Sequence, residues 1–150
     1  MGLDMYLYAE KFVSNAEYRS EQEKFNAIIK ALDANTFAKD HAIVELEVAY
    51  WRKANAIHGW FVQHAEADDC TPIYFTREQI AELLGICKQL LVDKNPDLAE
   101  ELLPPTAGFF FGSYEINDWY WKDVEETATI LDEILTNVPE DWSFRYQASW

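Results

Sequence analysis

Alternating apolar and polar positions mark three stretches of the chain as half-buried strands. In residues 3–13, Leu3 and Leu7 belong to an apolar series at every second position, with aromatic residues between them. The same period of two returns in 43–48 and in 142–150. Side chains two apart lie on one face of a strand, so this period predicts a sheet with one buried face. With a further short apolar run, the pattern predicts strands over 3–13, 43–48, 72–75 and 142–150.

Apolar residues three and four positions apart mark the helices. Ser20 with Glu23, and Thr76 with Gln79, match capping boxes, in which two side chains satisfy free backbone N–H groups at a helix start. We expect a helix after each box. Cys87 falls on the apolar stripe of the second helix, as a small core residue. Further helices are predicted over 97–103 and 118–138.

The order of these elements predicts a single α+β domain spanning residues 1–150, with a small antiparallel or mixed sheet and about four helices. The two terminal strands are expected to pair with each other or with the strand at 43–48. Residues 108–113 hold three consecutive phenylalanines between Gly108 and Gly112, which predicts a buried central strand. These glycines do not form a phosphate-binding loop, because no Gly-Lys-Ser/Thr follows them.

The stretch 50–61 gathers two tryptophans, two cations, an amide and an imidazole. We expect a helix that begins near Trp51 and ends near His64. At about 100° per residue, Trp51, Asn55 and His58 fall on one helical face, next to the face expected against the core. Free backbone N–H groups at the helix start would add donors for an anion. These side chains are therefore expected to share one space.

Two cations stand beside this face. Arg52 flanks it and Lys53 lies further round the helix, and together they are the densest source of positive charge in the chain. An indole offers a flat apolar platform, and arginine offers a forked cation suited to carboxylate or phosphate. An aromatic ring from a later run would supply a wall. The sequence thus predicts a site for a small, planar, anionic, nucleotide-like ligand, built from Trp51, Arg52, Lys53, Asn55, His58, Phe110 and Trp119.

A structural interpretation of the same residues stays open. The tryptophans of 50–61 can be core packing, and the two cations can pair with some of the many carboxylates. A histidine on a half-buried helix can be hydrogen-bonded structure. Asp4, which stands among apolar neighbours, can likewise hold backbone donors or act as a buried acid at a site.

The net charge of the chain limits the classes of molecule that it is expected to bind. The chain carries a net charge of −15, from 27 acids and 12 bases. Binding to DNA, RNA or an anionic membrane needs Lys and Arg, so this balance argues against all three. It favours a basic protein partner, divalent cations or mimicry of nucleic acid. Acids run nearly unopposed from Asp97 to Asp141, with Lys122 the one base between them; solvated helix faces are the plainer explanation.

The amino-terminal segment has no basic run and no long apolar run, so we expect neither a signal peptide nor a membrane anchor. This favours a reducing cytosol, in which Cys70 and Cys87 are free thiols. His58, His64 and Cys70 are possible metal ligands, but no Cys-x-x-Cys or His-x-x-x-His pair exists. We therefore expect no metal and no cofactor.

Four segments spread over almost the whole chain resemble a family of small proteins encoded by bacteriophages and prophages. They are Gly2-Leu3-Asp4-Met5-Tyr6-Leu7, Tyr50-Trp51-Arg52-Lys53-Ala54-Asn55-Ala56-Ile57-His58, Gly108-Phe109-Phe110-Phe111-Gly112-Ser113 and the ending Ser149-Trp150. The resemblance implies a phage origin and the host bacterial cytoplasm as the place of action. It implies no chemistry at any residue. Small nonstructural phage proteins often act against host defence, by capturing a signalling nucleotide or blocking a host protein.

Three functions follow as hypotheses. The first is nonenzymatic binding of the small anionic ligand. The second is an acidic inhibitor that resembles DNA and blocks a basic host protein. The third is a small enzyme in which His58 is the acid or base, Asp4 or a glutamate orients it, and Arg52 stabilises an anionic transition state. A surplus of aromatic residues also suggests a possible homodimer.

Overall fold

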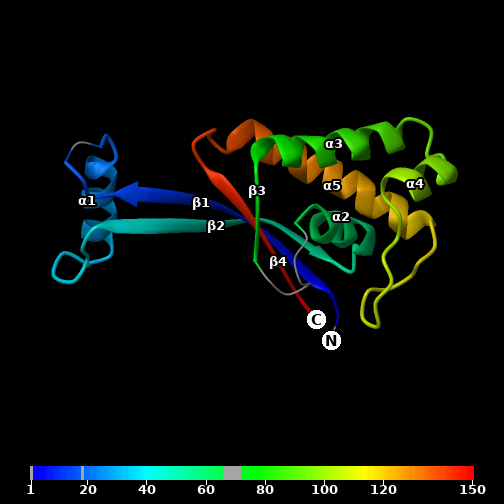
Figure 1. Cartoon of the computed structure of the whole chain (residues 1–150), viewed down its shortest axis with the longest axis horizontal. Helices are drawn as coiled ribbons and strands as arrows, with labels where there is room; N and C mark the ends of the chain where they lie inside the picture. The colour runs from blue at the N-terminus through cyan, green and yellow to red at the C-terminus, as the bar shows by residue number, and fades with distance from the viewer. Residues whose placement is uncertain (1, 18, 66–71) are drawn as a thin grey trace.

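A four-stranded antiparallel sheet forms the centre of the computed structural model, which describes residues 2–17, 19–65 and 72–150 (Figure 1). The strand order is β2-β1-β4-β3. The long first strand pairs with β2 on one side and with the carboxyl-terminal strand on the other, as predicted for the chain ends. The strands are β1 (Asp4–Ser14), β2 (His41–Arg52), β3 (Ile73–Phe75) and β4 (Ser143–Ser149).

Within the described ranges, five helices join these strands and confirm the α+β class. Three of them pack against the sheet, and one short helix covers the edge of that layer. Among the described residues, no helix is both long and apolar enough to cross a membrane. The helices are α1 (Gln22–Ala31), α2 (Asn55–Ala65), α3 (Arg77–Leu91), α4 (Pro96–Leu102) and α5 (Asp118–Asn137).

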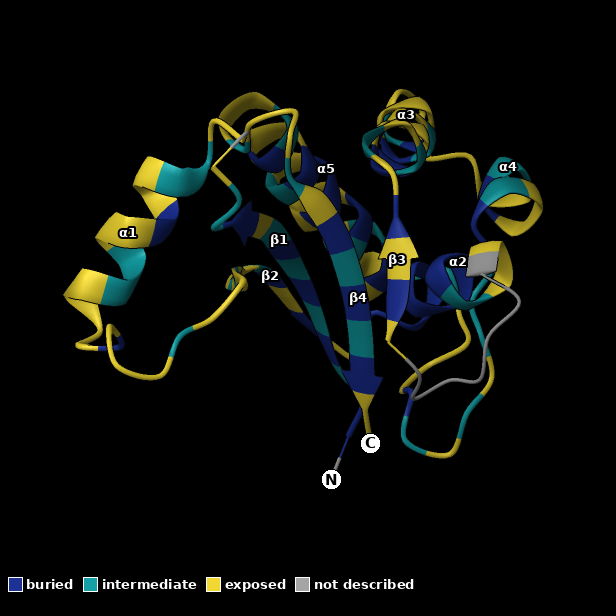
Figure 2. Ribbon diagram, turned by 60° about the vertical axis from the view of Figure 1, so that its left-hand side comes forward, coloured by how far each residue is buried: buried dark blue, intermediate teal, exposed yellow. Residues whose placement is uncertain are grey.

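The core lies between one face of the sheet and helices α2, α3 and α5 (Figure 2). Leu3, Met5 and Leu7 are fully buried, as the alternating pattern predicts. Phe61 of α2 stacks on Tyr146 of β4, with ring centres 4.1 Å apart. Cys87 is a core residue, and burial raises the pKa of its thiol to about 12.

One predicted capping box is confirmed and the other is wrong. Thr76 and Gln79 exchange hydrogen bonds at the start of α3, as the box requires. At α1 the N-cap is Glu21, one residue after Ser20, and it has no side-chain capping bond. Helix α1 thus begins later than its sequence motif indicates, without the stabilisation that a Ser cap provides.

The β1–β2 hairpin extends beyond the rest of the sheet. β4 pairs with β1 only from Asp4 to Glu10, whereas β2 continues to pair with it as far as Ser14. Residues 11–44, which comprise this two-stranded extension and α1 at its end, are called the arm below. Figure 1 shows α1 at the far end of the hairpin, away from the other helices.

Candidate functional site

The stretch expected to be one helix is instead a strand followed by a helix. β2 runs to Arg52, which pairs with Asp4, and α2 begins only at Asn55. Between them Lys53 adopts a positive φ of 59°, and its N–H donates to the Leu3 carbonyl at 2.8 Å. The predicted helix start near Trp51 is wrong, because pairing with β1 outweighs the helical spacing of the apolar residues.

Because residues 51 and 52 lie in a strand and not in a helix, Trp51 and Arg52, which were expected to share one site, are separated. In a strand, neighbouring side chains point to opposite faces. Trp51 points into the core, where its Nε1 donates to Thr127 Oγ1 at 3.0 Å. Arg52 points to the other face, with Nη1 4.0 Å from the Asp4 carboxylate, which also accepts from the Tyr50 hydroxyl.

Asn55 and His58 hold the structure together from within. Asn55 Nδ2 donates to the carbonyls of Phe111 and Ser113, at 3.0 and 2.8 Å, and its Oδ1 accepts from the Thr106 N–H at 3.0 Å. His58 is buried, with Nδ1 2.7 Å from the Tyr146 hydroxyl. The structural interpretation of these two side chains is therefore the one that their contacts support.

The predicted strand at 108–113 is wrong. This segment is a loop, in which Gly112 has a φ of 92° and the Phe111 N–H donates back to the Gly108 carbonyl. The three phenylalanines point to different environments: Phe111 is buried, Phe110 is partly buried, and Phe109 is almost fully exposed. The exposure of Phe109 could not be predicted from the sequence, because a run of three phenylalanines is typical of a buried strand.

A pocket of about 270 Å³ lies where α2 begins. Four of the predicted site residues border it: Arg52, Lys53, Asn55 and Trp119. The other three, Trp51, His58 and Phe110, do not line it. Its remaining walls come from the first residues of α2, the loop that follows Gly112 and the first two turns of α5, namely Ala54, Ala56, Ile57, Gly112, Ser113, Glu115, Asn117, Tyr120, Asp123 and Val124.

The start of α2 leaves backbone donors at this pocket. The Ala54 carbonyl accepts the first helical hydrogen bond, from the His58 N–H at 3.0 Å, which makes Ala54 the N-cap. An alanine has no side-chain oxygen, so it cannot satisfy the next N–H groups. Within the described part of the chain, the N–H groups of Ala56 and Ile57 have no hydrogen-bond partner, and both residues line the pocket.

Asp123 adds a half-buried carboxyl to the opposite wall. It has no hydrogen bond or salt bridge with any described residue, since neighbouring Lys122 pairs with Glu126 at 3.6 Å. Burial raises the pKa of Asp123 to about 6, and the charge of Glu126 adds to the rise. The sequence analysis missed this residue, although Asp123 follows Trp119 by four positions and so shares its helical face.

Trp119 borders the pocket and is 70% exposed. The Lys122 ammonium lies 5.5 Å from the ring centre. A large ring left open to water at the edge of a pocket is a platform on which a planar group can stack. The pocket thus joins backbone donors, a flat aromatic surface and an unpaired carboxyl.

No group of three potential metal ligands is assembled among the described residues, and Cys70, one of the predicted candidates, lies outside them. No protein-family model, curated protein or solved structure matches the chain. The function is therefore inferred from the chemistry of the pocket and of the surface.

Proposed function

We propose that the pocket at the start of α2 binds a small, planar, anionic ligand and does not transform it. The observation that carries this proposal is the uncapped start of α2, where the Ala56 and Ile57 N–H groups lack partners. Such donors, with the positive end of the helix dipole behind them, form a favourable place for carboxylate or phosphate. Lys53 and Arg52 at the border add positive potential.

The other walls define the rest of the ligand. The exposed Trp119 ring suits a flat heterocycle, which would stack on it. Asp123 and Glu115 line the pocket as acceptors, so they favour a ligand whose far edge carries N–H donors. A nucleotide with an amino-bearing base combines all three features. The net charge of −15 opposes an anion at long range, so this affinity rests on short-range contacts.

Capture of a signalling nucleotide in a bacterial host would give such a pocket a biological role. A phage origin, as the sequence resemblance implies, would provide this setting, and sequestration needs no catalytic group. His58, the acid or base of the enzyme hypothesis, does not line the pocket. An assay for ligand turnover separates the two functions, because sequestration predicts that the ligand is recovered unchanged.

The binding experiment uses a new cap for α2. Ala54→Ser would place a hydroxyl where it accepts from the free N–H groups, so it should raise the helix stability by about 1 kcal/mol. The same bond competes with the ligand, so we expect affinity for a nucleotide panel, measured by calorimetry, to fall about tenfold, equivalent to about 1.4 kcal/mol.

Glu21→Ser is the matched control, since it adds a cap to α1, far from the pocket, and should leave nucleotide affinity unchanged. Opposite movement of stability and affinity in the Ala54 variant cannot come from unfolding. If wild type binds no member of the panel, or if Ala54→Ser binds as wild type does, the proposal fails.

The charge distribution favours a second candidate, an inhibitor of a basic host protein. Outside the arm the chain contains 22 acids and 7 bases, and the exposed acids of α5 include Glu125, Glu126, Asp132 and Glu133. Carboxylates on a helix surface can stand in for DNA phosphates. This function predicts binding to a basic protein that weakens steeply with salt and with reversal of these four charges, while Ala54→Ser has no effect.

A further inference from the structure

The arm differs from the rest of the chain in its charge. Residues 11–44 contain five acids and five bases, so the arm carries no net charge. The remaining residues contain 22 acids and 7 bases, and they account for the whole net charge of −15. Two copies of this chain would repel each other through most of their surfaces, but not through their arms.

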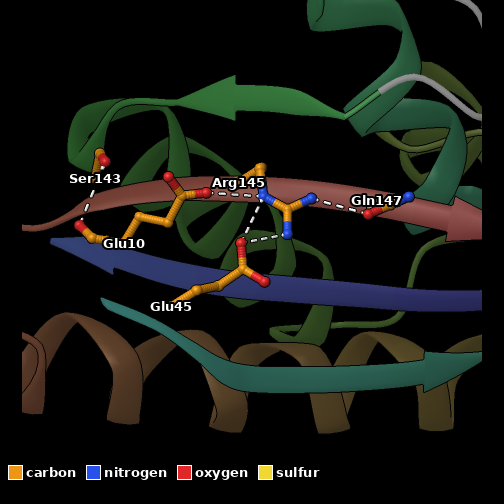
Figure 3. A network of polar contacts seen from close by, with 5 residues as sticks. All are labelled: Glu10, Glu45, Ser143, Arg145 and Gln147. Atoms are coloured by element: carbon orange, nitrogen blue, oxygen red, sulfur yellow. Dashed lines mark hydrogen bonds and ion pairs between the residues drawn. The ribbon is translucent and has the colours of Figure 1, made fainter. Parts of the chain in front are cut away.

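The base of the arm is fixed to the sheet by Arg145. Figure 3 shows its guanidinium between the carboxylates of Glu10 on β1 and Glu45 on β2. Nε lies 2.8 Å from Glu10 and 3.0 Å from Glu45, and Nη1 donates to Gln147 at 2.8 Å. This network holds three strands together at the last point where β4 supports β1.

Beyond this network the arm has little cover of its own. Two paired strands are marginally stable alone and need packing on at least one face. Among the described residues of the arm, the buried apolar ones are Val13, Phe25 and Ala34, and all three lie outside the main core. Phe25 is the one buried residue of α1, so this helix covers the hairpin over a small area.

Large apolar side chains remain exposed on the arm. Phe12 and Ile43 are direct partners across the ladder, 51% and 59% exposed. Leu32 and Phe37, between α1 and β2, are exposed as well. Beside Phe12 lies a hollow of about 380 Å³, bordered by Arg19, Asp40 and His41 among others. The arm therefore has both projecting apolar side chains and a hollow into which an apolar side chain of another molecule could insert.

We propose that the arms of two copies of this chain pack against each other about a two-fold axis, with Phe12 and Ile43 at the centre of the contact. A two-fold contact brings the same surface together twice, so it must be self-complementary. A surface with equal numbers of Lys/Arg and Asp/Glu meets this condition, whereas an acidic or basic partner would be selected by an arm of opposite net charge. The second copy is thus the occupant that the charge distribution favours.

The experiment measures mass by sedimentation equilibrium over a wide range of protein concentration. Wild type should approach twice the chain mass of 17.5 kDa as concentration rises. Phe12→Thr combined with Ile43→Thr keeps residues suited to strands, and should weaken association at least tenfold. Val92→Thr, at an exposed site outside the arm, is the matched control and should associate as wild type does.

The salt dependence of association and the hydrogen exchange of backbone amides provide two further tests of the proposed dimer. Salt screens the repulsion between acidic bodies, so it should strengthen this dimer, the reverse of its effect on a contact with a basic protein. Backbone amides of the arm should gain protection only at concentrations where the dimer forms. Wild type that stays monomeric throughout, or a double variant that folds and associates unchanged, overturns the proposal. If the double variant does not fold, the amide protection of wild type decides.

Discussion

The pocket at the start of α2 and the arm leave different groups without partners. The pocket leaves polar groups unsatisfied, namely two N–H groups and the Asp123 carboxyl, inside walls fixed by the core. The arm leaves large apolar side chains uncovered on a two-stranded ribbon against which the helix α1 packs. Unsatisfied polar groups in a rigid hollow suit a small ligand, whereas uncovered apolar groups on a projecting element suit a macromolecule.

Replacement of Trp51 tests whether it belongs to the core or to the pocket. Trp51→Ala should lower the free energy of unfolding by about 3–5 kcal/mol, because it leaves a cavity and removes the bond to Thr127. Urea denaturation measures this loss. A variant as stable as wild type would contradict the placement of this ring in the core.

The Arg145 network should matter most for the arm. Arg145→Gln removes the cation between Glu10 and Glu45, and we expect a loss of about 2 kcal/mol, as for hydrogen bonds to charged groups. Amides of the arm should then exchange faster than those of α3 and α5. Equal acceleration in all elements would mean that the network does not hold the arm specifically.

Replacement of Trp119 should have the opposite effect to replacement of Trp51, because it should weaken ligand binding and hardly change stability. Trp119→Ala should change the free energy of unfolding by less than about 0.5 kcal/mol, since the ring is largely exposed. Its effect on nucleotide affinity should be about 1–3 kcal/mol, the value of stacking a base on an aromatic side chain. Calorimetry and denaturation on the same samples separate the two effects. Unchanged affinity would remove Trp119 from the site.

The raised pKa of Asp123 predicts that the stability of the protein depends on pH. Its pKa is higher in the folded state, so its contribution favours folding below about pH 4 and is lost as pH rises through about 6. Asp123→Asn should therefore be more stable than wild type by about 1 kcal/mol at pH 7.5, a value reduced because solvent screens the half-exposed carboxyl. The advantage should vanish near pH 4. A constant difference across this range would contradict the shifted pKa.

Sequence patterns predict the strands and most helices because burial on one face imposes a period. The period of two in β1 and β4 and the capping box at Thr76 are local signals, and the structure confirms them. The junction at 50–54 has no such signal, because its strand depends on pairing with β1, distant in sequence. Four candidate residues border the pocket all the same, and two of them, Arg52 and Lys53, lie at the junction itself.

Other parts of the site depend on groups without a sequence signal. The free N–H groups of Ala56 and Ile57 belong to the backbone, and they matter because the residue before them cannot cap a helix. Asp123 resembles the other acids of α5 in sequence, and it is burial in the fold, with the added charge of Glu126, that raises its pKa. A missing cap in front of a helix is the signal that could have indicated the site.

Amide NMR spectra during titration with inorganic phosphate test the central claim most directly. If the start of α2 receives an anion, the Ala56 and Ile57 resonances should move furthest, and the Ala54→Ser substitution should suppress both shifts. Amides at the start of α3, where Thr76 caps the helix, serve as the internal reference and should stay still. Shifts confined to other residues, or equal at both helix starts, would contradict an anion site in this pocket.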